Sequence, residues 1–551
     1  MSGFGERFRK AGYEIPKPLI LINNRPIISY VIDMFPGEKN FTFICNNEHL
    51  KNSSFMMEKT IKKYCPTAKI IGISSHKLGP VYAIAQCFEL INDDEPTIVN
   101  YCDFTCYWDW TYFKKIISKH RYGGVIPAYR GFHPHSLGKT NYAYIKENNF
   151  TLIDIREKKS FTSNKMNEYA SSGTYFFNTG RLMKEAFKYT LSNDLKVNNE
   201  YYVSLAYKYL LKNNIDTLIY PLQHFMQWGT PEDLKAYLNW DQIFKKLLLK
   251  DIQKNLDKKI GTLILPMAGK GKRFQERGYR DPKPLIKVSG DYMVIQTLKM
   301  LPKAGSYSFT LLSSKASSKI KNILQRNFSQ PIIKILKAPT DGQAKSAKIA
   351  YDNILKDKGE IESPLTIAAC DNGNIFNFQK FSDLISKDKI DIIVWGVRGH
   401  PNAIKNPKMY GWIEERNGKI LNISVKEPLS NILNDPIITG TFTFKDKAIY
   451  EKLHKDLIDA NYKVNNEYYV DSLIDIAVKK GLNCQLFEID HYLSWGTPDE
   501  LLTFQYWQSC FHKWSSHQYL VENDKLVTNK NSLINTFYNF TALDELKKSL
   551  Q

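Results

Sequence analysis

The sequence lacks the patterns that mark membrane, disulfide-rich or zinc-binding proteins. Its eight cysteines include no Cys-x-x-Cys pair, so neither a zinc knuckle nor a disulfide framework is indicated, and we expect reduced thiols. No apolar run approaches the roughly 18 residues of a membrane span. The N-terminus opens on glycines instead of a signal peptide. We therefore expect a cytoplasmic protein without a membrane span.

A dense block of basic residues is also missing, although the formal net charge is +20. Such a charge can indicate a polyanionic partner. Lysine, however, is spread over every segment together with Asn and Ile, without the interleaved aromatic residues of a nucleic-acid-binding stretch. We expect no nucleic acid partner, because anionic nucleotide substrates explain a local excess of positive charge equally well.

What the sequence does contain is an internal repeat. Residues 2–20 read SGFGERFRKAGYEIPKPLI and residues 268–286 read AGKGKRFQERGYRDPKPLI. Cys-Asp, Gly-Thr, Val-Asn-Asn-Glu-Tyr-Tyr-Val and Trp-Gly-Thr-Pro segments recur at the same offset of 266 to 268 residues. This period means two whole domains, because solenoid repeats span only about 20 to 50 residues. We predict copy one at 1–240, a polar linker at 241–260, copy two at 261–507 and a C-terminal extension at 508–551.

The order of apolar segments in copy two predicts the fold. We expect strands at 262–266, 309–313, 332–336 and 365–370, and a helix at 343–354. Alternating strands and helices predict an α/β fold with a mixed, mainly parallel sheet, helices on both faces and right-handed crossovers. Ligands of such sheets bind outside the carboxyl ends of the strands, where the glycine loop, Gly342 and Asp371 fall.

The repeated glycine loop predicts a triphosphate-binding site. Its glycines let backbone N–H groups approach phosphate oxygens, and the following Arg and Lys add positive charge. An isolated Gly-x-Gly is typical of an ordinary turn, but the fixed spacing to Pro-Lys-Pro-Leu occurs twice, which favours a ligand loop. The loop matches neither a Walker motif nor a dinucleotide-binding motif. Its residues are Gly269, Gly271, Arg273 and Lys283 in copy two, and Gly3, Gly5, Arg7 and Lys17 in copy one.

These motifs resemble the signature of the sugar-1-phosphate nucleotidylyltransferases, also called nucleotide-sugar pyrophosphorylases. The resemblance covers nearly all of both copies and implies two Rossmann-like domains of the glycosyltransferase A type. It implies that the loop Arg and the Pro-Lys-Pro Lys contact the nucleoside triphosphate, so we expect catalytic roles for these four residues. It also implies nucleotide binding by Ala268, Asp341, Gly342 and Gln343, with Gly79 as the copy-one equivalent.

The resemblance further implies Mg²⁺, with Asp371 and Asp103 as ligands at the ends of strands. A helix N-cap is the alternative interpretation of Asp371. In-line attack on the α-phosphorus spreads charge over pyrophosphate, which a divalent ion neutralises. Many family members carry a second Asp ligand, but this sequence has Ser494 and Gln227 there. The replacement in copy two is left open between Asp490, Glu467 and water.

On the acceptor side, Lys426 and Lys158 resemble the lysine that meets the sugar phosphate, although neither copy keeps a complete Glu-Lys-Pro motif. Glu467 and Glu200 lie in the repeated Asn-Asn-Glu-Tyr-Tyr segment, which resembles the sugar-side segment of the family. The alternative for that segment is a helix N-cap with an acidic first turn. The Trp-Gly-Thr-Pro segment is also typical of a turn before a helix that begins with Pro.

We therefore expect an enzyme that transfers NMP from an NTP to a phosphorylated acceptor, first of all a sugar 1-phosphate, and releases pyrophosphate. Synthesis of surface polysaccharide or glycoconjugate precursors is the expected setting. A cytidylyltransferase for a non-sugar phosphate such as phosphocholine, a glycosyltransferase of the same fold, and a non-catalytic binding copy are the alternatives. Copy two is the expected catalytic unit, and a homo-oligomer is left open.

Copy one as written lacks the strand that leads into its glycine loop, because Met1 aligns with Met267. In copy two that strand precedes Met267. Without it, two neighbouring strands would have unpaired backbone groups. Two explanations are open: the true start lies upstream, or copy one is a degenerate domain that is stabilised by docking on copy two.

Overall fold

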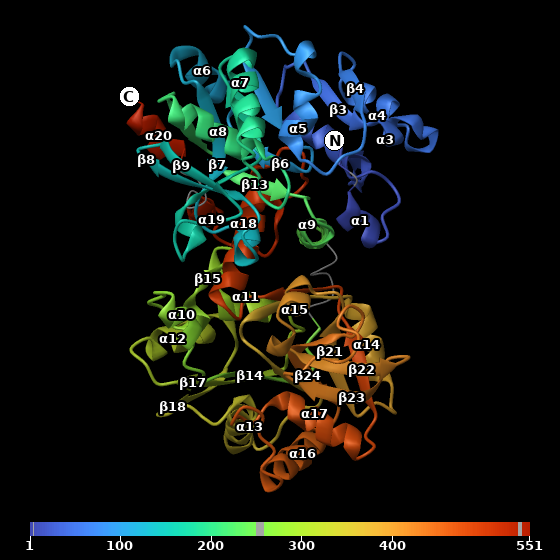
Figure 1. The fold of residues 1–551 in the computed structure, drawn as a ribbon. Coiled ribbons are helices and arrows are strands. Elements are labelled where there is room, and N and C mark those ends of the chain that lie inside the picture. The colour runs from blue at the N-terminus through green and yellow to red at the C-terminus, as the bar shows by residue number, and fades with distance from the viewer. Residues whose placement is uncertain (4, 250–257, 538–542, 551) are drawn as a thin grey trace. The chain divides into compact units, whose positions relative to one another are not determined.

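The computed structural model describes residues 1–3, 5–249, 258–537 and 543–550. They form two units, each treated by itself below. Unit 1 contains Met1–Asp241, Ser509–His517 and Ile534–Gln551, and unit 2 contains Gln242–Gln508 and Gln518–Leu533. Copy one, blue to green in Figure 1, thus belongs to unit 1, and copy two, yellow-green to orange, belongs to unit 2.

Unit 2 contains the complete set of strands that the repeat predicts. The strands are β14 (Thr262–Met267), β15 (Lys287–Val288), β16 (Asp291–Tyr292), β17 (Ser306–Leu312), β18 (Ile332–Leu336), β19 (Leu365–Ala368), β20 (Asn372–Ile375), β21 (Ile392–Val397), β22 (Gly411–Arg416), β23 (Lys419–Val425), β24 (Ile437–Phe444), β25 (Cys484–Glu488) and β26 (His491–Ser494). All four strands expected in copy two are present as β14, β17, β18 and β19.

Nine of these strands form one sheet in the order β18-β17-β14-β19-β24-β21-β25-β23-β22. The first four run parallel, whereas β24 pairs antiparallel with both β19 and β21. β24 therefore reverses the strand direction in the middle of the sheet. The predicted mixed α/β sheet is confirmed.

Helices cover both faces of this sheet. Every residue of β14 is buried, and its side chains alternate between two cores. Ile264 packs in one core with Ala347 of α13, while Leu263 and Leu265 pack in the other with Val294 of α11. Alternation along a strand that is buried on both sides explains its continuous apolar run. The helices of unit 2 are α10 (Lys272–Glu276), α11 (Met293–Lys299), α12 (Ser317–Asn327), α13 (Gln343–Lys358), α14 (Phe378–Ser386), α15 (Pro401–Lys405), α16 (Lys447–Asp459) and α17 (Val470–Lys479). Residues of α18 (Pro498–Lys513) and α19 (Lys530–Thr536) belong partly to unit 2 and partly to unit 1.

Unit 1 repeats the pattern with a divided sheet. Its strands are β1 (Leu21–Ile22), β2 (Arg25–Pro26), β3 (Thr42–Asn46), β4 (Lys69–Ile73), β5 (Thr97–Asn100), β6 (Phe104–Tyr107), β7 (Gly124–Tyr129), β8 (Ala143–Asn148), β9 (Thr151–Glu157), β10 (Tyr169–Ser171), β11 (Thr174–Phe177), β12 (Thr217–Pro221) and β13 (His224–Gln227). Seven form a sheet in the order β10-β8-β9-β12-β7-β11-β5, and β3 and β4 form a separate parallel pair. Only β7 and β12 are parallel neighbours among the described strands of the larger sheet.

The division falls where copy two has β14. In unit 2, β14 pairs with β17 on one side and β19 on the other. The copy-one counterparts of these neighbours are β3 and β5. Among the described residues of unit 1, no strand pairs with both of them. Each therefore has one unpaired edge facing the position that β14 occupies in unit 2.

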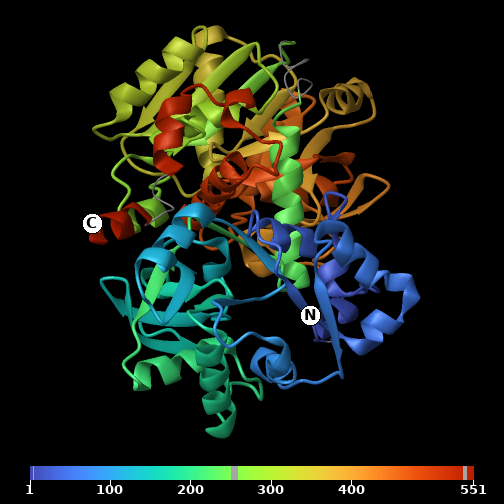
Figure 2. The same cartoon turned by 90° about the horizontal axis from the view of Figure 1, so that it is seen from above.

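The helices of unit 1 include a contribution from the C-terminal extension. Helix α20 (Leu543–Ser549) packs on β12, and its Leu543 and Leu546 belong to the core of copy one. Helix α20 lies near β8 and β9 in Figure 1, and Figure 2 shows the same cartoon from above. Of the predicted linker, residues 250–257 lie outside the described residues. The other helices are α1 (Glu6–Lys10), α2 (Ile27–Asp33), α3 (Asn47–Lys51), α4 (Met57–Tyr64), α5 (Pro80–Ala85), α6 (Trp110–Lys119), α7 (Gly180–Ser192), α8 (Val203–Lys212) and α9 (Pro231–Lys246).

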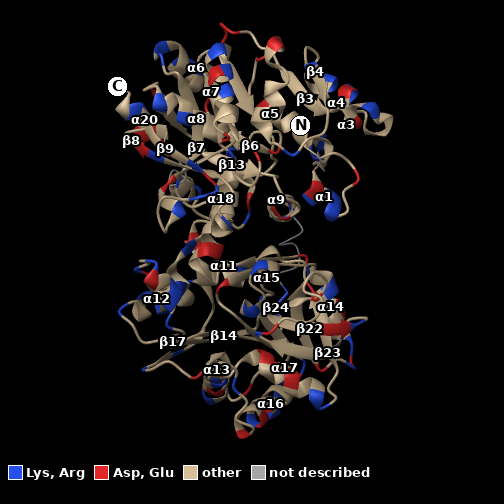
Figure 3. Cartoon of the chain, viewed as in Figure 1, with Lys and Arg blue, Asp and Glu red and all other residues tan. Residues whose placement is uncertain are grey.

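The described residues also bear on three expected absences. All eight cysteines are free, and six are buried. No helix in the described ranges combines the length and the apolar character that a membrane crossing requires. Basic and acidic residues are interspersed along the chain of both units (Figure 3).

Candidate active site

The glycine loop of copy two follows the carboxyl end of β14. Gly271 closes the loop in the left-handed region, with φ of 62°, and is the N-cap of α10. A β-carbon at Gly269 would meet no heavy atom of the described residues within 4 Å, so packing does not require glycine there. Gly5 has φ of 64° before α1, and Gly3 is equally open. Both loops thus leave the free space beside the backbone that a phosphate-binding loop requires.

The lysine of the Pro-Lys-Pro-Leu motif joins three segments that are far apart in the sequence. Lys283 begins a 3-10 helix, η7 (Lys283–Leu285). Its Nζ donates to the carboxylate of Asp371 and, at 3.2 Å, to the carbonyl oxygen of Gly496. The same contacts recur in copy one at 2.7 and 3.2 Å, where the three residues are Lys17, Asp103 and Gly229.

Asp371 lies at the centre of this arrangement. Strand β20 follows it directly, so the alternative that Asp371 caps a helix is wrong. Its backbone carbonyl accepts a hydrogen bond from Trp495 N at 2.9 Å. Burial raises the pKa of its carboxyl group, but the positive charges of Lys283 and Arg273 outweigh burial and hold the pKa below the usual value. The carboxylate is therefore ionised at neutral pH.

Among the predicted nucleotide-binding residues, Gly342 contacts the backbone of the Asn-Asn-Glu-Tyr-Tyr segment. Gly342 has φ of 113°, and a β-carbon there would lie 2.5 Å from both N and O of Tyr468. Tyr468 N donates to Asp341 O at 2.8 Å, and Ala344 N donates to Tyr468 O at 3.0 Å. Gly79 makes the equivalent close approach to Tyr201 in copy one. Glycine is thus required because two backbones touch. Gln343 is the first residue of α13.

The Asn-Asn-Glu-Tyr-Tyr segment forms a turn. Asn465 and Asn466 have φ of 50° and 64°, a left-handed conformation that Asn tolerates well. Helix α17 begins after this turn, with Tyr469 as its N-cap residue and without a side-chain cap. The segment thus supplies the N-cap position through Tyr469, and the acidic residue of the first turn is Asp471. Burial and the neighbouring Glu467 raise the pKa of Tyr469 to about 12.

The predicted acceptor lysine of copy two is buried among the other predicted site residues. Burial lowers the pKa of Lys426, and the charges that act on it are those of Asp471, Arg273, Asp371 and Glu467. Its Nζ lies 5.7 Å from the ring centroid of Tyr469. The structure thus brings the glycine-loop Arg, the strand-end Asp and the acceptor lysine into one site.

Copy one has the same layout with different neighbours. Lys158 Nζ donates to the hydroxyl of Tyr202 at 2.5 Å. Burial raises the pKa of Tyr202, a hydrogen bond from its hydroxyl to Glu200 raises it further, and Arg7 lowers it. Arg7, Lys158 and Glu200 are therefore gathered around one tyrosine, as their counterparts are gathered around Tyr469.

The Trp-Gly-Thr-Pro segment precedes helix α18, as its sequence predicts, and it also contributes a contact to the site. Thr497 caps the start of α18: its Oγ1 accepts a hydrogen bond from Glu500 N at 3.2 Å and donates one to Glu500 Oε2 at 3.0 Å. Gly496 meanwhile supplies the carbonyl oxygen that binds Lys283. A β-carbon at Gly496 would lie 3.4 Å from carboxylate oxygens of both Asp371 and Glu500. Sequence reasoning missed Glu500, although Thr-x-x-Glu is a recognisable signal.

The oxygen donors of this site fit Mg²⁺. This ion binds through one or two carboxylates together with substrate phosphates and keeps several waters. Asp371 supplies one carboxylate beside the loop. The carboxylate of Glu500 lies nearby but accepts hydrogen bonds from Asn402, Tyr410 and Thr497. Asp490 pairs with Lys246 at 2.7 Å, so its carboxylate is already engaged. Within the described ranges, no cluster of three or more His, Cys, Asp or Glu side chains forms a protein-only cage.

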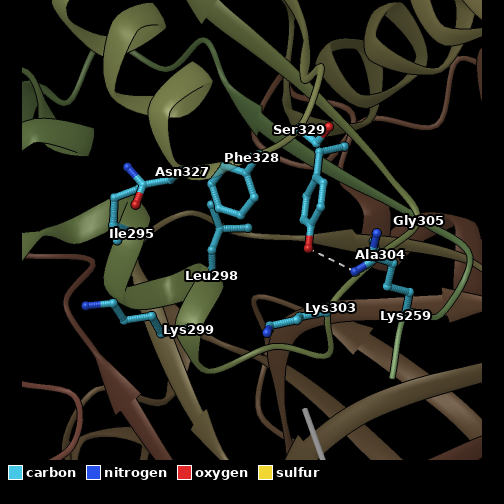
Figure 4. Close-up of a pocket in the computed structure, with 11 residues that line it drawn as sticks. Lys259, Ile295, Leu298, Lys299, Lys303, Ala304, Gly305, Asn327, Phe328 and Ser329 are labelled. Carbon is cyan, nitrogen blue, oxygen red and sulfur yellow. Dashed lines mark hydrogen bonds between the residues drawn. The ribbon is translucent and has the colours of Figure 1, made fainter. Parts of the chain in front are cut away.

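A separate hollow of unit 2 lies away from these motifs. Its lining includes Leu298, Lys303 and Phe328, together with Tyr307, whose hydroxyl accepts a hydrogen bond from Ala304 N at 2.9 Å (Figure 4). None of its lining residues is a predicted site residue.

Comparison with known proteins agrees with the repeated motifs. The model of the family described as Nucleotidyl transferase matches residues 1–215, which confirms the predicted resemblance. Over residues 1–215 the chain thus resembles the nucleotidyl transferase family. The matched residues are those of copy one, and copy two repeats the same motifs with the same contacts.

Three solved structures resemble the chain at low identity. A nucleoside-diphosphate-sugar pyrophosphorylase from Vibrio cholerae RC9 is 19% identical, with 44% of this chain and 98% of that one covered and a TM-score of 0.37. The inositol-1-phosphate CTP transferase from T. maritima is 14% identical, with 45% of this chain and 96% of that one covered and a TM-score of 0.36. A putative glucose-1-phosphate thymidylyltransferase from Bacillus anthracis is 15% identical, with 44% of this chain and 93% of that one covered and a TM-score of 0.34. The family assignment therefore depends on the match over residues 1–215.

Proposed function

We propose that the chain transfers NMP from an NTP to a phosphorylated acceptor, with a sugar 1-phosphate as the first candidate, and releases pyrophosphate. The observation that carries the proposal is the convergence of Lys283, Asp371 and Gly496 beside the open glycine loop. Because Lys17, Asp103 and Gly229 make the same contacts in copy one, the proposal extends to both copies.

The reaction assigns a role to each charged group. A phosphate oxygen of the acceptor attacks the α-phosphorus, and the bond from that phosphorus to the bridging oxygen of pyrophosphate breaks in line. The glycine loop, Arg273 and Lys283 hold the triphosphate and stabilise the charge that develops on the leaving group. Lys426 holds the acceptor phosphate and reduces its repulsion from the triphosphate. No protein nucleophile is required.

Asp371 has the chemistry to hold Mg²⁺ in copy two, and Asp103 has it in copy one. When bound, the ion neutralises charge on the phosphates. Without the ion, Lys283 is the partner of Asp371, so the two groups neutralise each other until the triphosphate arrives. Substrate binding then draws the ammonium group of Lys283 towards the phosphates.

Two alternatives stay within the same fold. A cytidylyltransferase for a non-sugar phosphate such as phosphocholine uses the same triphosphate site and differs only in the acceptor. A glycosyltransferase that consumes a nucleotide sugar is disfavoured, because it has no triphosphate for the glycine loop and the Pro-Lys-Pro lysine to bind.

Pyrophosphate release with each of the four NTPs, crossed with a panel of acceptors, tests the proposal. The panel contains sugar 1-phosphates, phosphocholine and an unphosphorylated sugar. We expect release with one NTP and a phosphorylated acceptor, and a loss of magnesium-dependent turnover in Asp371→Asn and in Asp103→Asn for the respective copy. Glycosyl transfer from a nucleotide sugar without pyrophosphate release would instead support the glycosyltransferase.

A further inference from the structure

The acceptor lysines of the two copies occupy equivalent places. Lys158 follows the end of β9 and Lys426 follows the end of β23, and both have left-handed backbones with φ of 54° and 64°. Lysine rarely adopts this conformation unless its surroundings impose it. Each ammonium group also lies near the ring of a tyrosine, Tyr202 before α8 in copy one and Tyr469 before α17 in copy two, at 4.5 and 5.7 Å. The two pockets can therefore be compared residue by residue.

The carboxylate beside this lysine comes from opposite sides of the pocket in the two copies. In copy one it is Glu157, the last residue of β9, which accepts a hydrogen bond from Ser204 Oγ of α8 at 2.6 Å. The equivalent positions of copy two hold Val425 on β23 and Asp471 on α17. At this pair of positions each copy thus has one carboxylate, supplied by the strand in copy one and by the helix in copy two.

In copy two, the residues around Asp471 leave room for its carboxylate. Asp471 is only 9% exposed. A β-carbon at Gly411 would lie 2.4 Å from Oδ2 of Asp471, so only glycine leaves room for this carboxylate. Copy one has Ala143 at the position of Gly411. Opposite Ala143 it has Ser204, which is smaller than Asp471. Burial raises the pKa of Asp471 and the charge of Lys426 lowers it.

A third difference changes the size of the pocket. In copy one, the ring of Tyr101 fills the space beside Gly173, with Cδ2 3.0 Å from the position of a β-carbon on that glycine. Its hydroxyl also accepts a hydrogen bond from Val203 N, at the start of α8. The matching residue of copy two is Ala369, whose β-carbon lies 3.2 Å from the β-carbon position of Gly440. Ala369 is partly exposed, and its methyl group is much smaller than the ring of Tyr101.

We propose that the two copies select different phosphorylated acceptors, and that Asp471 is the residue by which copy two recognises its own. The acceptor of copy two is a hydroxyl-bearing phosphate compound that donates a hydrogen bond towards α17 and extends into the space beside Ala369. The acceptor of copy one is smaller on that side and donates towards β9. A buried carboxylate that binds a substrate hydroxyl discriminates strongly against an analogue without it, because the carboxylate is then left unpaired. This inference rests on the proposed function.

Binding measurements on the full chain test the inference separately from the reaction. Lys158→Met removes acceptor binding by copy one, so the affinity measured for this variant is that of copy two. Lys426→Met removes acceptor binding by copy two, so the affinity measured for it is that of copy one. Calorimetric titration of both variants with a panel of sugar 1-phosphates and their single-deoxy analogues gives two rank orders of affinity. We expect the two orders to differ, with the bulkier sugar phosphates bound by copy two.

Two further variants, made in the Lys158→Met background, assign the difference to Asp471. Asp471→Asn should lower the affinity of copy two for its preferred acceptor by at least about 10-fold and leave the matching deoxy analogue unchanged. The combined change Val425→Glu and Asp471→Ser should move its rank order towards that of copy one. Asp475→Asn is the control, because Asp475 is a buried aspartate one turn further along α17 that pairs with Lys479 at 2.7 Å.

The outcomes separate the two proposals. Equal rank orders in the two lysine variants, or no binding by either, would overturn the inference. An Asp471→Asn effect that Asp475→Asn reproduces would overturn the role of Asp471, because both changes would then act through the fold. Distinct rank orders without pyrophosphate release under any condition would leave the inference standing and overturn the proposed function.

Discussion

At the scale of single residues, Glu157 makes the stability of copy one depend on pH. Burial raises the pKa of its carboxyl group to about 7, from an ordinary value of 4.5. The folded state therefore holds the proton more tightly than the unfolded state. This stabilisation is complete below about pH 4.5 and is lost as the pH rises through 7, at a total cost of roughly 3 kcal/mol.

The variant Glu157→Gln removes the titrating group and keeps a hydrogen-bond acceptor for Ser204. Unfolding of unit 1, followed by thermal denaturation and by hydrogen exchange in β9, should show equal stability of the two proteins near pH 4. At pH 8 the variant should be the more stable. An identical pH dependence of both proteins would show that the carboxyl group is not held in its neutral form.

Gly342 offers a second test at this scale, because its close approach to Tyr468 should not tolerate a side chain. Gly342→Ala should lower stability by more than about 2 kcal/mol, since the methyl group would collide with backbone atoms. Nucleotide binding should weaken with it. Gly359→Ala at the other end of α13 is the control. That glycine also has a positive φ, of 77°, but open space around it, so we expect a loss of about 1 kcal/mol. Equal losses in urea denaturation would contradict the collision.

At the scale of elements, the divided sheet of unit 1 predicts that an added strand will stabilise it. The edges of β3 and β5 face the position that β14 occupies in unit 2. A fusion that places the chain's own residues 261–266 before Met1 should pair with both edges. We expect a higher melting temperature and slower hydrogen exchange in β3 and β5, compared with a fusion of six Gly and Ser residues. The same exchange rates in both fusions would show that the added residues do not pair with β3 and β5.

The sequence predicts some elements better than others, for physical reasons. The apolar run at 262–266 marks a parallel strand that is buried on both faces. The run at 332–336 also forms a strand, although this edge strand is largely exposed. The antiparallel insertion of β24 between β19 and β21 depends on contacts between distant residues, which no local pattern records. For the site, the repeated loop and Pro-Lys-Pro-Leu motifs indicate Lys283. Asp471 carries no comparable signal, because its importance arises from Val425 and Gly411, which only the fold brings near it.

At the scale of the whole molecule, the C-terminal extension contributes to the core of copy one. Leu546 of α20 is fully buried there, and Glu545 pairs with Arg130 at 3.1 Å. Leu546→Ala should therefore lower the stability of unit 1 by about 2 to 5 kcal/mol. Lys548→Ala on the exposed side of α20 should change it by less than about 0.5 kcal/mol. Hydrogen exchange should accelerate in β12 and stay unchanged in β14. Faster exchange in β14 alone would contradict the assignment of α20 to unit 1.

The central claim is that each copy binds a triphosphate between its glycine loop and its Pro-Lys-Pro lysine and transfers the nucleotidyl group. Its most direct test is the rate of pyrophosphate release by the unchanged chain and by the double variant Lys17→Ala, Lys283→Ala, with Lys380→Ala on α14 as the control. The account predicts release by the unchanged chain and by the control, and a loss of about 10²-fold or more in the double variant, because the positive charge that stabilises the leaving pyrophosphate is gone. Full activity in the double variant would contradict the account.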